Sequence, residues 1–210
     1  MKLRVLPSGM LSTNGYLLLE PSRGEAVLVD APEGVWPTVN AILEGEKCRL
    51  TELWLTHGHW DHIEDAAKIV RETGARVRAH ADDKVFYETP EVMASFFYWV
   101  QEFEPVKVDH WVVQGEKFEA LGAEIEVRHV PGHAPGNVAF YVAALESVFV
   151  GDTLFAGGLG RTDLPGGSHE VLSAGIRAQL YTLPDKTAVY PGHGPATTVG
   201  AEKRGNPYVA

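Results

Sequence analysis

The chain has 210 residues, 45% of them hydrophobic, and a formal net charge of −10 at pH 7. This length and apolar content suffice for one substantial core, no linker-like stretch divides the sequence, and we expect a single domain over residues 1–210. The acidic balance argues against a nucleic-acid partner, and the lack of a signal peptide or of an apolar stretch of about 20 residues argues against membrane contact and for a cytoplasmic location.

The first quarter of the chain has short strand patterns and one helical pattern, which together indicate a mixed α/β architecture. Residues 16–20 and 26–30 are predicted strands, and residues 35–45 are a predicted helix ended by its glycine. The single cysteine, Cys48, excludes an internal disulfide and lies between two cationic residues ahead of the next strand. We interpret it as a bystander rather than a nucleophile.

A dense group of histidines follows the next predicted strand, residues 53–55, and has the sequence His57-Gly58-His59-Trp60-Asp61-His62. A helix is expected directly after it, because apolar residues recur at helical spacing and a glycine at position 74 supplies a stop. These apolar residues are Ile63, Ala66, Ala67 and Val70. The histidine group is therefore predicted to lie on a strand-to-helix turn.

Side-chain direction on this turn points to metal binding. In an extended segment residues i and i+2 face the same way, so His57 and His59 can bind one ion while Asp61 and His62 address a second. The alternative for Asp61 is a helix cap, because Asp61 and Glu64 have the spacing of a capping box. Capping does not require three neighbouring histidines, so we favour the metal interpretation.

Residues 86–103 are rich in aromatic side chains and interrupt the strand pattern. The segment contains Phe86, Tyr87, Phe96, Phe97, Tyr98, Trp99 and Phe103. Packing into the core is the interpretation we favour. A cap over a binding pocket and a contact between subunits are the alternatives.

Three later segments with strand character end in turns that carry further metal-competent residues. They lead to Pro131-Gly132-His133, to Gly151-Asp152 and to Pro191-Gly192-His193. Open α/β sheets gather ligand groups just beyond the carboxyl ends of their strands, and the glycine before each residue lets the backbone turn sharply. We therefore expect His133, Asp152 and His193 to join the histidine group. The remaining histidines are interpreted as surface or packing residues, namely His80, His110, His129 and His169.

Taken together, these motifs resemble the metallo-β-lactamase superfamily in order and spacing over nearly the whole chain. The matching stretches are residues 56–62, 131–133, 151–155 and 191–195. The resemblance implies an α/β fold of the four-layer αββα sandwich type, with two mixed sheets and helices outside. It implies a first metal on His57, His59 and His133, and a second on Asp61, His62 and His193. Asp152 would bridge the two ions, and Asp61 and Asp152 would be the catalytic carboxylates.

Within that superfamily, residues 151–155 together with Gly160-Arg161-Thr162-Asp163 look like the glyoxalase II group, which hydrolyses glutathione thioesters. Only 17 residues follow His193 in the chain of 210, so the sequence looks like the short glyoxalase II-like hydrolases that lack a helical C-terminal domain. The resemblance implies that Arg161 contacts the substrate, and a guanidinium suits a carboxylate. An internal ion pair between Arg161 and Asp163 is the alternative.

A pair of divalent metal ions sets the predicted chemistry. Two cations roughly 3.5–4 Å apart can hold a bridging hydroxide and polarise a carbonyl, so the enzyme needs no serine or cysteine nucleophile. Zinc is the default, and iron and manganese accept the same ligands. The expected reaction is attack of that hydroxide on a small-molecule thioester such as an S-acylglutathione. The expected assembly is a monomer or a small homo-oligomer.

Four other functions compete with this interpretation. A mononuclear iron persulfide dioxygenase has the same fold and a similar Gly-Arg-Thr-Asp stretch, but it does not need Asp61, His62 and His193 as ligands. A non-catalytic zinc protein is disfavoured because the set contains no cysteine. A nuclease is disfavoured by the acidic charge. A β-lactam hydrolase is disfavoured because such enzymes are normally secreted.

Overall fold

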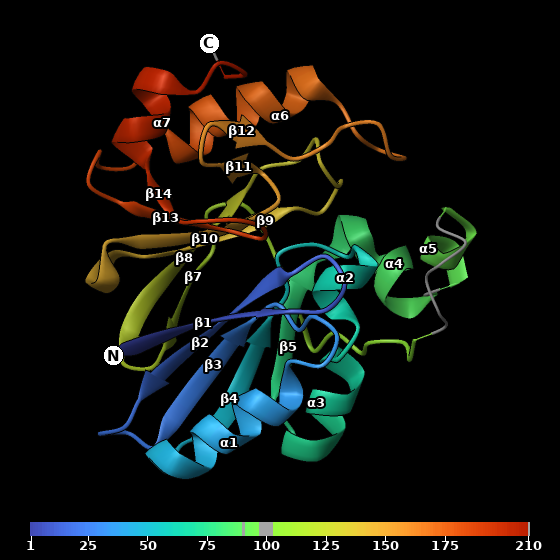
Figure 1. The fold of residues 1–210 in the computed structure, drawn as a ribbon, viewed down its shortest axis with the longest axis vertical. Helices are drawn as coiled ribbons and strands as arrows, with labels where there is room; N and C mark the ends of the chain where they lie inside the picture. The colour runs from blue at the N-terminus through green and yellow to red at the C-terminus, as the bar shows by residue number, and fades with distance from the viewer. Residues whose placement is uncertain (90, 97–102, 210) are drawn as a thin grey trace. The chain divides into compact units, whose positions relative to one another are not determined.

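The computed structural model describes residues 1–89, 91–96 and 103–209, and it divides into two compact units, Met1–Trp111 and Val112–Ala210 (Figure 1). Each unit is built on a sheet of six strands. No helix in the described ranges is long and apolar enough to cross a bilayer. The single domain over residues 1–210 stays a prediction, and the two units are described one at a time.

The sheet of the first unit has the strand order β1-β2-β3-β4-β5-β6. The strands are β1 (Lys2–Ser8), β2 (Thr13–Glu20), β3 (Glu25–Val29), β4 (Arg49–Trp54), β5 (Arg76–His80) and β6 (His110–Val112). β1, β2 and β3 pair antiparallel, whereas β3, β4 and β5 pair parallel. The carboxyl ends of β3, β4 and β5 therefore lie along one edge of this sheet, the arrangement that positions ligand groups.

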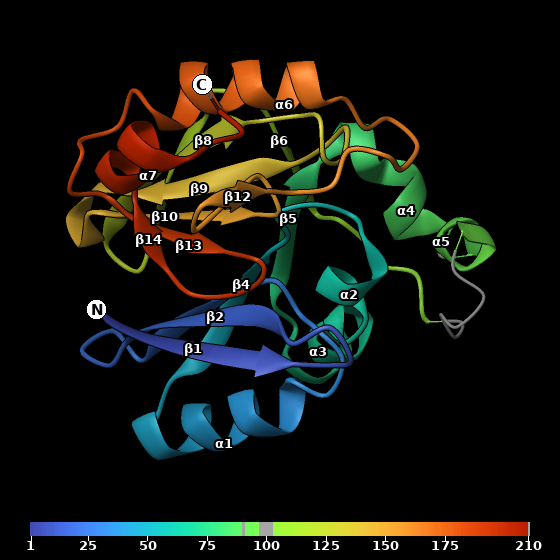
Figure 2. The ribbon, with the colours of Figure 1, turned by 45° about the horizontal axis from the view of Figure 1, so that its top comes forward.

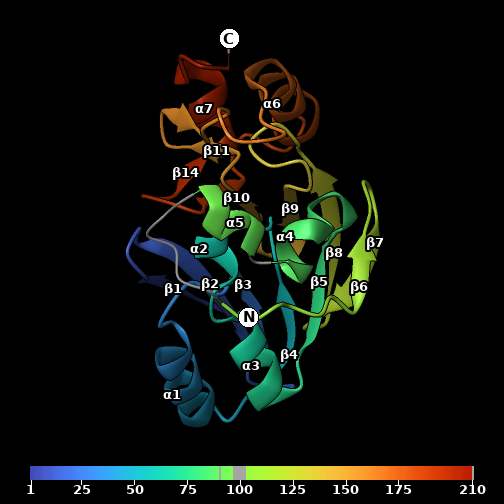
Figure 3. The same ribbon diagram turned by 90° about the vertical axis from the view of Figure 1, so that its right-hand side faces the viewer.

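Helices α1 (Trp36–Glu46) and α3 (Ala66–Thr73) of the first unit pack on one face of its sheet. Its other helices are α2 (Trp60–Ile63), α4 (Lys84–Glu88) and α5 (Glu91–Phe96), with a 3₁₀ turn at Ala81–Asp83. Figure 3 shows α1 and α3 side by side along the sheet. Val39 of α1 and Ile69 of α3 are fully buried in one apolar cluster with Leu28 and Leu53. Truncating such a leucine to alanine typically costs about 2–5 kcal/mol.

Two helix boundaries differ from the sequence prediction. The helix expected to end at Gly45 continues to Glu46, and Lys47 adopts the left-handed conformation at φ 56°. The N–H groups of Lys47 and Cys48 donate to the carbonyls of Glu44 and Leu43, which satisfies the helix end without a glycine. The predicted strands at residues 16–20 and 26–30 agree with β2 and β3.

The helix predicted after the histidine group is two helices, α2 and α3. The break lies at Asp65, whose N–H donates to the Ala31 carbonyl and whose carboxylate accepts from the Trp36 N–H. The Asp65 N–H therefore bonds to the segment before α1 instead of to a carbonyl of the preceding helical turn, and the helix is interrupted. Gly74 ends α3 at φ 70°, as predicted. Ile69 is fully buried, whereas Val70, predicted for the buried face, is half-buried.

The second unit has a sheet of strand order β14-β13-β10-β9-β8-β7 and a separate two-stranded hairpin, β11-β12. Its strands are β7 (Lys117–Ala120), β8 (Ala123–His129), β9 (Val138–Val142), β10 (Ser147–Gly151), β11 (Leu154–Phe155), β12 (Gly158–Leu159), β13 (Ala188–Pro191) and β14 (Thr197–Thr198). β9 is antiparallel to both β8 and β10, and β13 is parallel to β10. β8, β10 and β13 therefore run in the same direction and end at one edge.

Two helical segments pack on this second sheet (Figure 2). The first is α6 (His169–Gly175), which continues as a π-helical turn at Ile176–Leu180, and the second is α7 (Val199–Gly205). A 3₁₀ turn at Ala143–Leu145 joins β9 to β10. Leu172, Ile176 and Val199 are fully buried in one cluster with Val148 and Val189 of the sheet. This core fixes the turns that follow β8, β10 and β13.

Candidate metal centre

The turn between β4 and α2 carries what we call the N-terminal ligand set, His57, His59, Asp61 and His62. All four are buried, with at most 8% of each residue exposed. The ring of His57 lies 4.6 Å from that of His59 and 4.1 Å from that of His62, between centroids. The Nε2 atom of His62 lies 3.5 Å from Oδ2 of Asp61. The structure thus brings together the four side chains that the sequence predicted on this turn.

Asp30, which follows β3 directly, orients two of these imidazoles. Its carboxylate accepts hydrogen bonds from the N–H and the hydroxyl of Thr56, each at 2.8 Å, and lies 2.8 Å from Nδ1 of His62. Because the Thr56 hydroxyl donates to Asp30, it accepts the Nδ1–H of His57 at 3.1 Å. With Nδ1 protonated, Nε2 carries the lone pair of each ring, which is the form that binds a metal.

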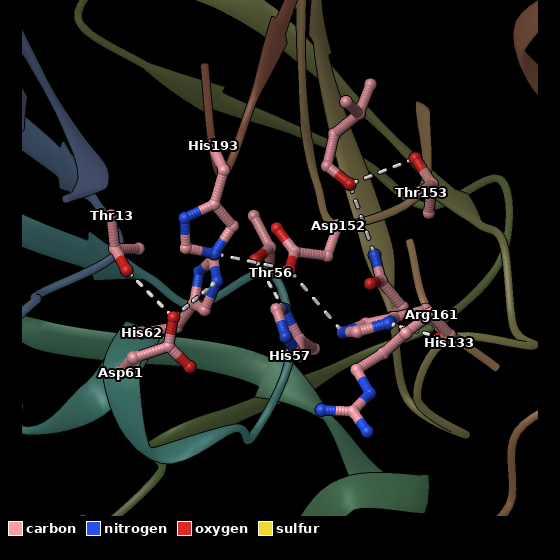
Figure 4. Close-up of polar contacts among 12 residues, drawn as sticks. Thr13, Thr56, His57, Asp61, His62, His133, Asp152, Thr153, Arg161 and His193 are labelled. Carbon is pink, nitrogen blue, oxygen red and sulfur yellow. Dashed lines mark hydrogen bonds and ion pairs between the residues drawn. The ribbon is translucent and has the colours of Figure 1, made fainter. Parts of the chain in front are cut away.

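Asp61 is held by a hydroxyl rather than used as a helix cap. Oδ2 of Asp61 accepts from the Thr13 hydroxyl at 2.7 Å, a contact drawn in Figure 4. The cap position of α2 is His59, and Asp61 lies inside the first turn, so the capping-box alternative is wrong. Burial, and then the charges of nearby carboxylates that include Asp61, raise the pKa of Glu64 to about 7. The Asp61 carboxylate therefore adds to the negative charge near Glu64.

The His57–His59 segment also packs closely against the start of α4. Oδ2 of Asp83 accepts from the N–H of Gly58 at 2.8 Å. A Cβ atom on Gly58 would lie 2.7 Å from Cβ of Phe86, so a larger residue would push the turn away. The glycine between the two histidines is therefore required by packing.

Core packing, the favoured interpretation of the aromatic segment, is confirmed for its first residues. Phe86 is 7% exposed and Tyr87 fully buried, and Phe86 forms a cluster with Trp60 and Met93. Phe96 is 45% exposed. Three further aromatic residues of this prediction, Phe97, Tyr98 and Trp99, lie outside the described residues.

The second unit carries the C-terminal ligand set, His133, Asp152 and His193, in the turns after β8, β10 and β13. Oδ2 of Asp152 lies 3.7 Å from Nε2 of His133 and 3.3 Å from Nε2 of His193 (Figure 4). His133 and Asp152 are buried, and His193 is half-buried. The structure therefore brings these three predicted residues together, with one carboxylate oxygen near both imidazoles.

A main-chain carbonyl orients His133, and glycines let the chain approach the C-terminal ligand set closely. Nδ1 of His133 lies 2.8 Å from the main-chain carbonyl of Arg161, which can only accept, so Nε2 of His133 again carries the lone pair. A Cβ atom on Gly160 would lie 1.9 Å from the Asp152 carbonyl oxygen and 2.9 Å from Nδ1 of His133. Gly132, at φ 122°, lies against the backbone of Leu172. Glycines thus let the chain approach close enough to hold the set.

The Arg161 side chain forms the internal ion pair that the sequence left as an alternative. Its guanidinium makes two hydrogen bonds of 2.7 Å to the two carboxylate oxygens of Asp163. The Arg161 hydrogen bond holds the pKa of Asp163 at about 2. Both side chains are more than half exposed, so a substrate carboxylate could replace Asp163 at little cost. Substrate binding by Arg161 stays a prediction.

The remaining histidines have structural contacts or lie on the surface, as predicted. Nδ1 of His80 accepts from the N–H of Asp82, Nε2 of His129 donates to the Pro135 carbonyl, and His110 and His169 are exposed. Five residues that hold the ligands have no role predicted from the sequence, namely Thr13, Asp30, Thr56, Asp83 and Gly160. Asp30 could have been predicted, because it is the last residue of a predicted strand.

The donor chemistry of the two sets fits divalent metal ions. Imidazole nitrogens and carboxylate oxygens, without any cysteine, suit zinc, iron and manganese. His57, His62 and His133 each have Nδ1 held by an oxygen acceptor, so that Nε2 is prepared for coordination.

The chain matches a known protein family and has similar relatives. The model described as the metallo-beta-lactamase superfamily matches residues 9–193. The chain is 33% identical to hydroxyacylglutathione hydrolase GloC of Haemophilus influenzae, over 100% of this chain and 98% of that protein. It is also 33% identical to the probable metallo-hydrolase YqgX of Bacillus subtilis, with the same coverage.

Three solved structures share the fold over all or nearly all of the chain. The BLEG-1 B3 metallo-beta-lactamase has a TM-score of 0.92 at 32% identity, covering 100% of both chains. TTHA1623 in a di-iron-bound form has a TM-score of 0.85 at 35% identity, covering 98% of this chain and 99% of its own. ETHE1 from Myxococcus xanthus has a TM-score of 0.84 at 28% identity, covering 100% of this chain and 85% of its own.

Proposed function

Because this chain belongs to the metallo-β-lactamase superfamily, we propose that it is a dinuclear metallo-hydrolase that cleaves a small-molecule thioester such as an S-acylglutathione. Membership confirms the predicted family and the predicted mixed α/β fold class of the metallo-β-lactamase type. The superfamily consists mostly of enzymes that act on small molecules. The thioester, the pair of ions, their identity and the cytoplasmic location belong to the proposal.

The proposed site combines both ligand sets. His57, His59 and His133 hold the first ion, and Asp61, His62 and His193 hold the second, with Asp152 between them. The observation that carries this assignment is that imidazoles in both sets are oriented in the same way for metal binding. Nδ1 of His57, His62 and His133 faces an oxygen acceptor, which leaves Nε2 for coordination. Two histidines outside these sets have other arrangements: His129 has Nε2 rather than Nδ1 held by a carbonyl, and His80 accepts a hydrogen bond at Nδ1.

When bound, a pair of divalent cations supplies a hydroxide nucleophile at neutral pH and positive charge for the oxyanion of the thioester. The protein's own groups complete that chemistry. The buried carboxylates of Asp30, Asp61 and Asp152 balance the positive charge, because burial of uncompensated charge costs several kcal/mol. Thr13 and Thr56 fix the carboxylates through their hydroxyls, so the ligands need little reorganisation when a cation binds.

The thioester substrate is supported by the GloC relative. This chain covers 98% of GloC, whose name describes hydroxyacylglutathione hydrolysis, so that activity is assigned to a chain of nearly the same length. The short stretch after His193 is therefore compatible with a glutathione thioester. Arg161 is the proposed contact for a glutathione carboxylate, because its guanidinium is more than half exposed and already binds a carboxylate.

The decisive test is hydrolysis of S-lactoylglutathione by protein whose metal content has been measured. We expect thiol release that scales with bound metal and requires about two equivalents of zinc, iron or manganese per chain. Protein with two bound equivalents of each metal in turn and no thiol release would rule out the proposed substrate. Gel filtration with light scattering on the same sample would test the proposed monomer or small homo-oligomer.

Persulfide oxidation is the second candidate, and the similarity to ETHE1 favours it, as does the stretch from Gly160 to Asp163. That reaction needs one iron and molecular oxygen, so oxygen uptake with glutathione persulfide on iron-loaded protein separates the two functions. A β-lactam ring is a further substrate class to include in the assay, given the similarity to a B3 metallo-beta-lactamase. We expect neither oxygen uptake nor β-lactam cleavage to match thioester turnover.

A further inference from the structure

The stretch of chain after His193 contains a buried carboxylate that the proposed chemistry does not use. Glu202 lies in α7 and is 5% exposed. Oε2 of Glu202 accepts from the N–H of Gly157 at 3.0 Å and from Nδ2 of Asn206 at 2.8 Å, and Oε1 accepts from the Thr197 hydroxyl at 2.6 Å. Three donors on one buried carboxylate compensate its loss of hydration.

One of these donors belongs to the hairpin that connects Asp152 to Gly160. Gly157, at φ 72°, lies in the turn between β11 and β12. Asn206 strengthens this attachment, because the same Nδ2 group also donates to the Gly158 carbonyl at 2.9 Å. The hairpin returns the chain to Gly160, which packs against the Asp152 carbonyl oxygen. Glu202 therefore holds the tip of the loop that runs between Asp152 and Gly160.

Another donor belongs to the strand that follows His193. Thr197 lies four residues after His193. It begins β14 and pairs with Val189 of β13. The ring of Phe155, on the hairpin, meets the ring of His193 edge-on at 6.3 Å between centroids. The hairpin after Asp152 therefore contacts His193 directly, and Glu202 bonds both to this hairpin and to the segment after His193.

From this arrangement we propose that Glu202 is a positioning residue for the C-terminal ligand set: its carboxylate ties the β11-β12 turn to Thr197 and so fixes Asp152 relative to His193. The inference rests on the proposed function in so far as that set binds metal. Loss of this tie lets the hairpin and the His193 turn move independently, which weakens metal binding by the set even though Glu202 touches no ligand.

Cobalt binding tests the proposal, because its affinity and its visible absorption spectrum report ligand geometry without any turnover. Glu202→Gln keeps the side-chain size but places an amide among three donors. Because removal of a group that orients ligands typically costs about 10–100-fold in metal affinity, we expect at least about a tenfold loss for this variant, with an altered cobalt spectrum. Thr197→Val removes one donor at constant shape and should show a smaller change in the same direction, and Thr197→Ser should restore the wild-type values.

The control is Lys203→Ala in the same helix, which removes an exposed ion pair with Asp185 that also attaches α7. It should leave cobalt affinity and spectrum unchanged. If Glu202→Gln and Thr197→Val lower only the melting temperature and bind cobalt as the wild type does, Glu202 is a structural anchor and the proposal is overturned. A wild-type protein that binds two cobalt ions without cleaving a thioester would instead overturn the proposed substrate and leave the role of Glu202 intact.

Discussion

The two ligand sets are held by different kinds of group. The four residues of the N-terminal set lie within six positions of sequence and are oriented by side chains, above all by the Asp30 carboxylate and the Thr13 and Thr56 hydroxyls. The C-terminal set is spread over residues 133–193 and is oriented by a main-chain carbonyl and by glycines that allow close approach. A substitution of a neighbouring side chain should therefore disorganise the first set directly, whereas the second should respond to changes in its ligands, in its backbone and in the Glu202 contacts to the β11-β12 turn and Thr197.

The largest effect we expect comes from the one residue proposed to serve both ions. Asp152→Ala removes the carboxylate oxygen that lies 3.7 Å and 3.3 Å from two imidazoles. Activity should fall by more than about 100-fold, the upper end for loss of a group that merely orients a ligand, and bound metal should decrease. Metal analysis and thiol release on the same preparation measure both. Glu119→Ala, an exposed carboxylate on β7, is the control, and an Asp152→Ala enzyme with full metal content and rate would contradict the assignment.

The same contrast explains what the sequence could predict. The ligands could be predicted because each lies in a turn that follows a strand pattern, and the carboxyl ends of strands that run in one direction meet at the same edge of a sheet. Asp30 lies at the end of a strand too. Its role comes from contacts of its carboxylate with Thr56 and His62, which are far from it in sequence, so no local sequence pattern predicts them. The sequence shows Gly160 only as part of a motif. A glycine is required there because the backbone lies close to the Asp152 carbonyl oxygen, and that contact is visible only in the folded structure.

Asp30→Asn tests the dependence of the N-terminal set on side chains. Asparagine accepts the left-handed conformation that Asp30 adopts at φ 57°, so the backbone should be retained. The charge that holds Nδ1 of His62 and the Thr56 hydroxyl is lost, and we expect metal affinity to fall by about 10–100-fold in a chelator competition. Asp65→Asn, which alters a carboxylate that accepts from a main-chain N–H, should leave affinity unchanged. Equal losses in both variants would indicate general destabilisation.

Gly160→Ala tests the dependence of the C-terminal set on backbone approach. The added methyl group must displace the Asp152 carbonyl oxygen, which would otherwise lie 1.9 Å away. Overpacking of this kind typically destabilises by about 1–3 kcal/mol, and urea unfolding of metal-free protein measures it. Gly205→Ala is the control, because a Cβ atom there meets nothing within 4 Å. If both variants unfold at the same urea concentration, the close approach at Gly160 has no energetic importance.

The smallest effect on the metal site is expected at Arg161, where main chain and side chain have separate roles. Arg161→Ala keeps the carbonyl that accepts from His133, so metal affinity should not change, and loss of an exposed ion pair should alter stability by no more than about 1 kcal/mol. If the guanidinium binds a glutathione carboxylate, KM should rise by about tenfold or more while kcat changes little, since a charge-assisted hydrogen bond contributes about 1.5–3 kcal/mol. Asp163→Ala frees the same guanidinium and should not raise KM. An unchanged KM in Arg161→Ala would show that the side chain does not bind substrate. Arg161 would then act on the site only through its main-chain carbonyl, which contacts His133.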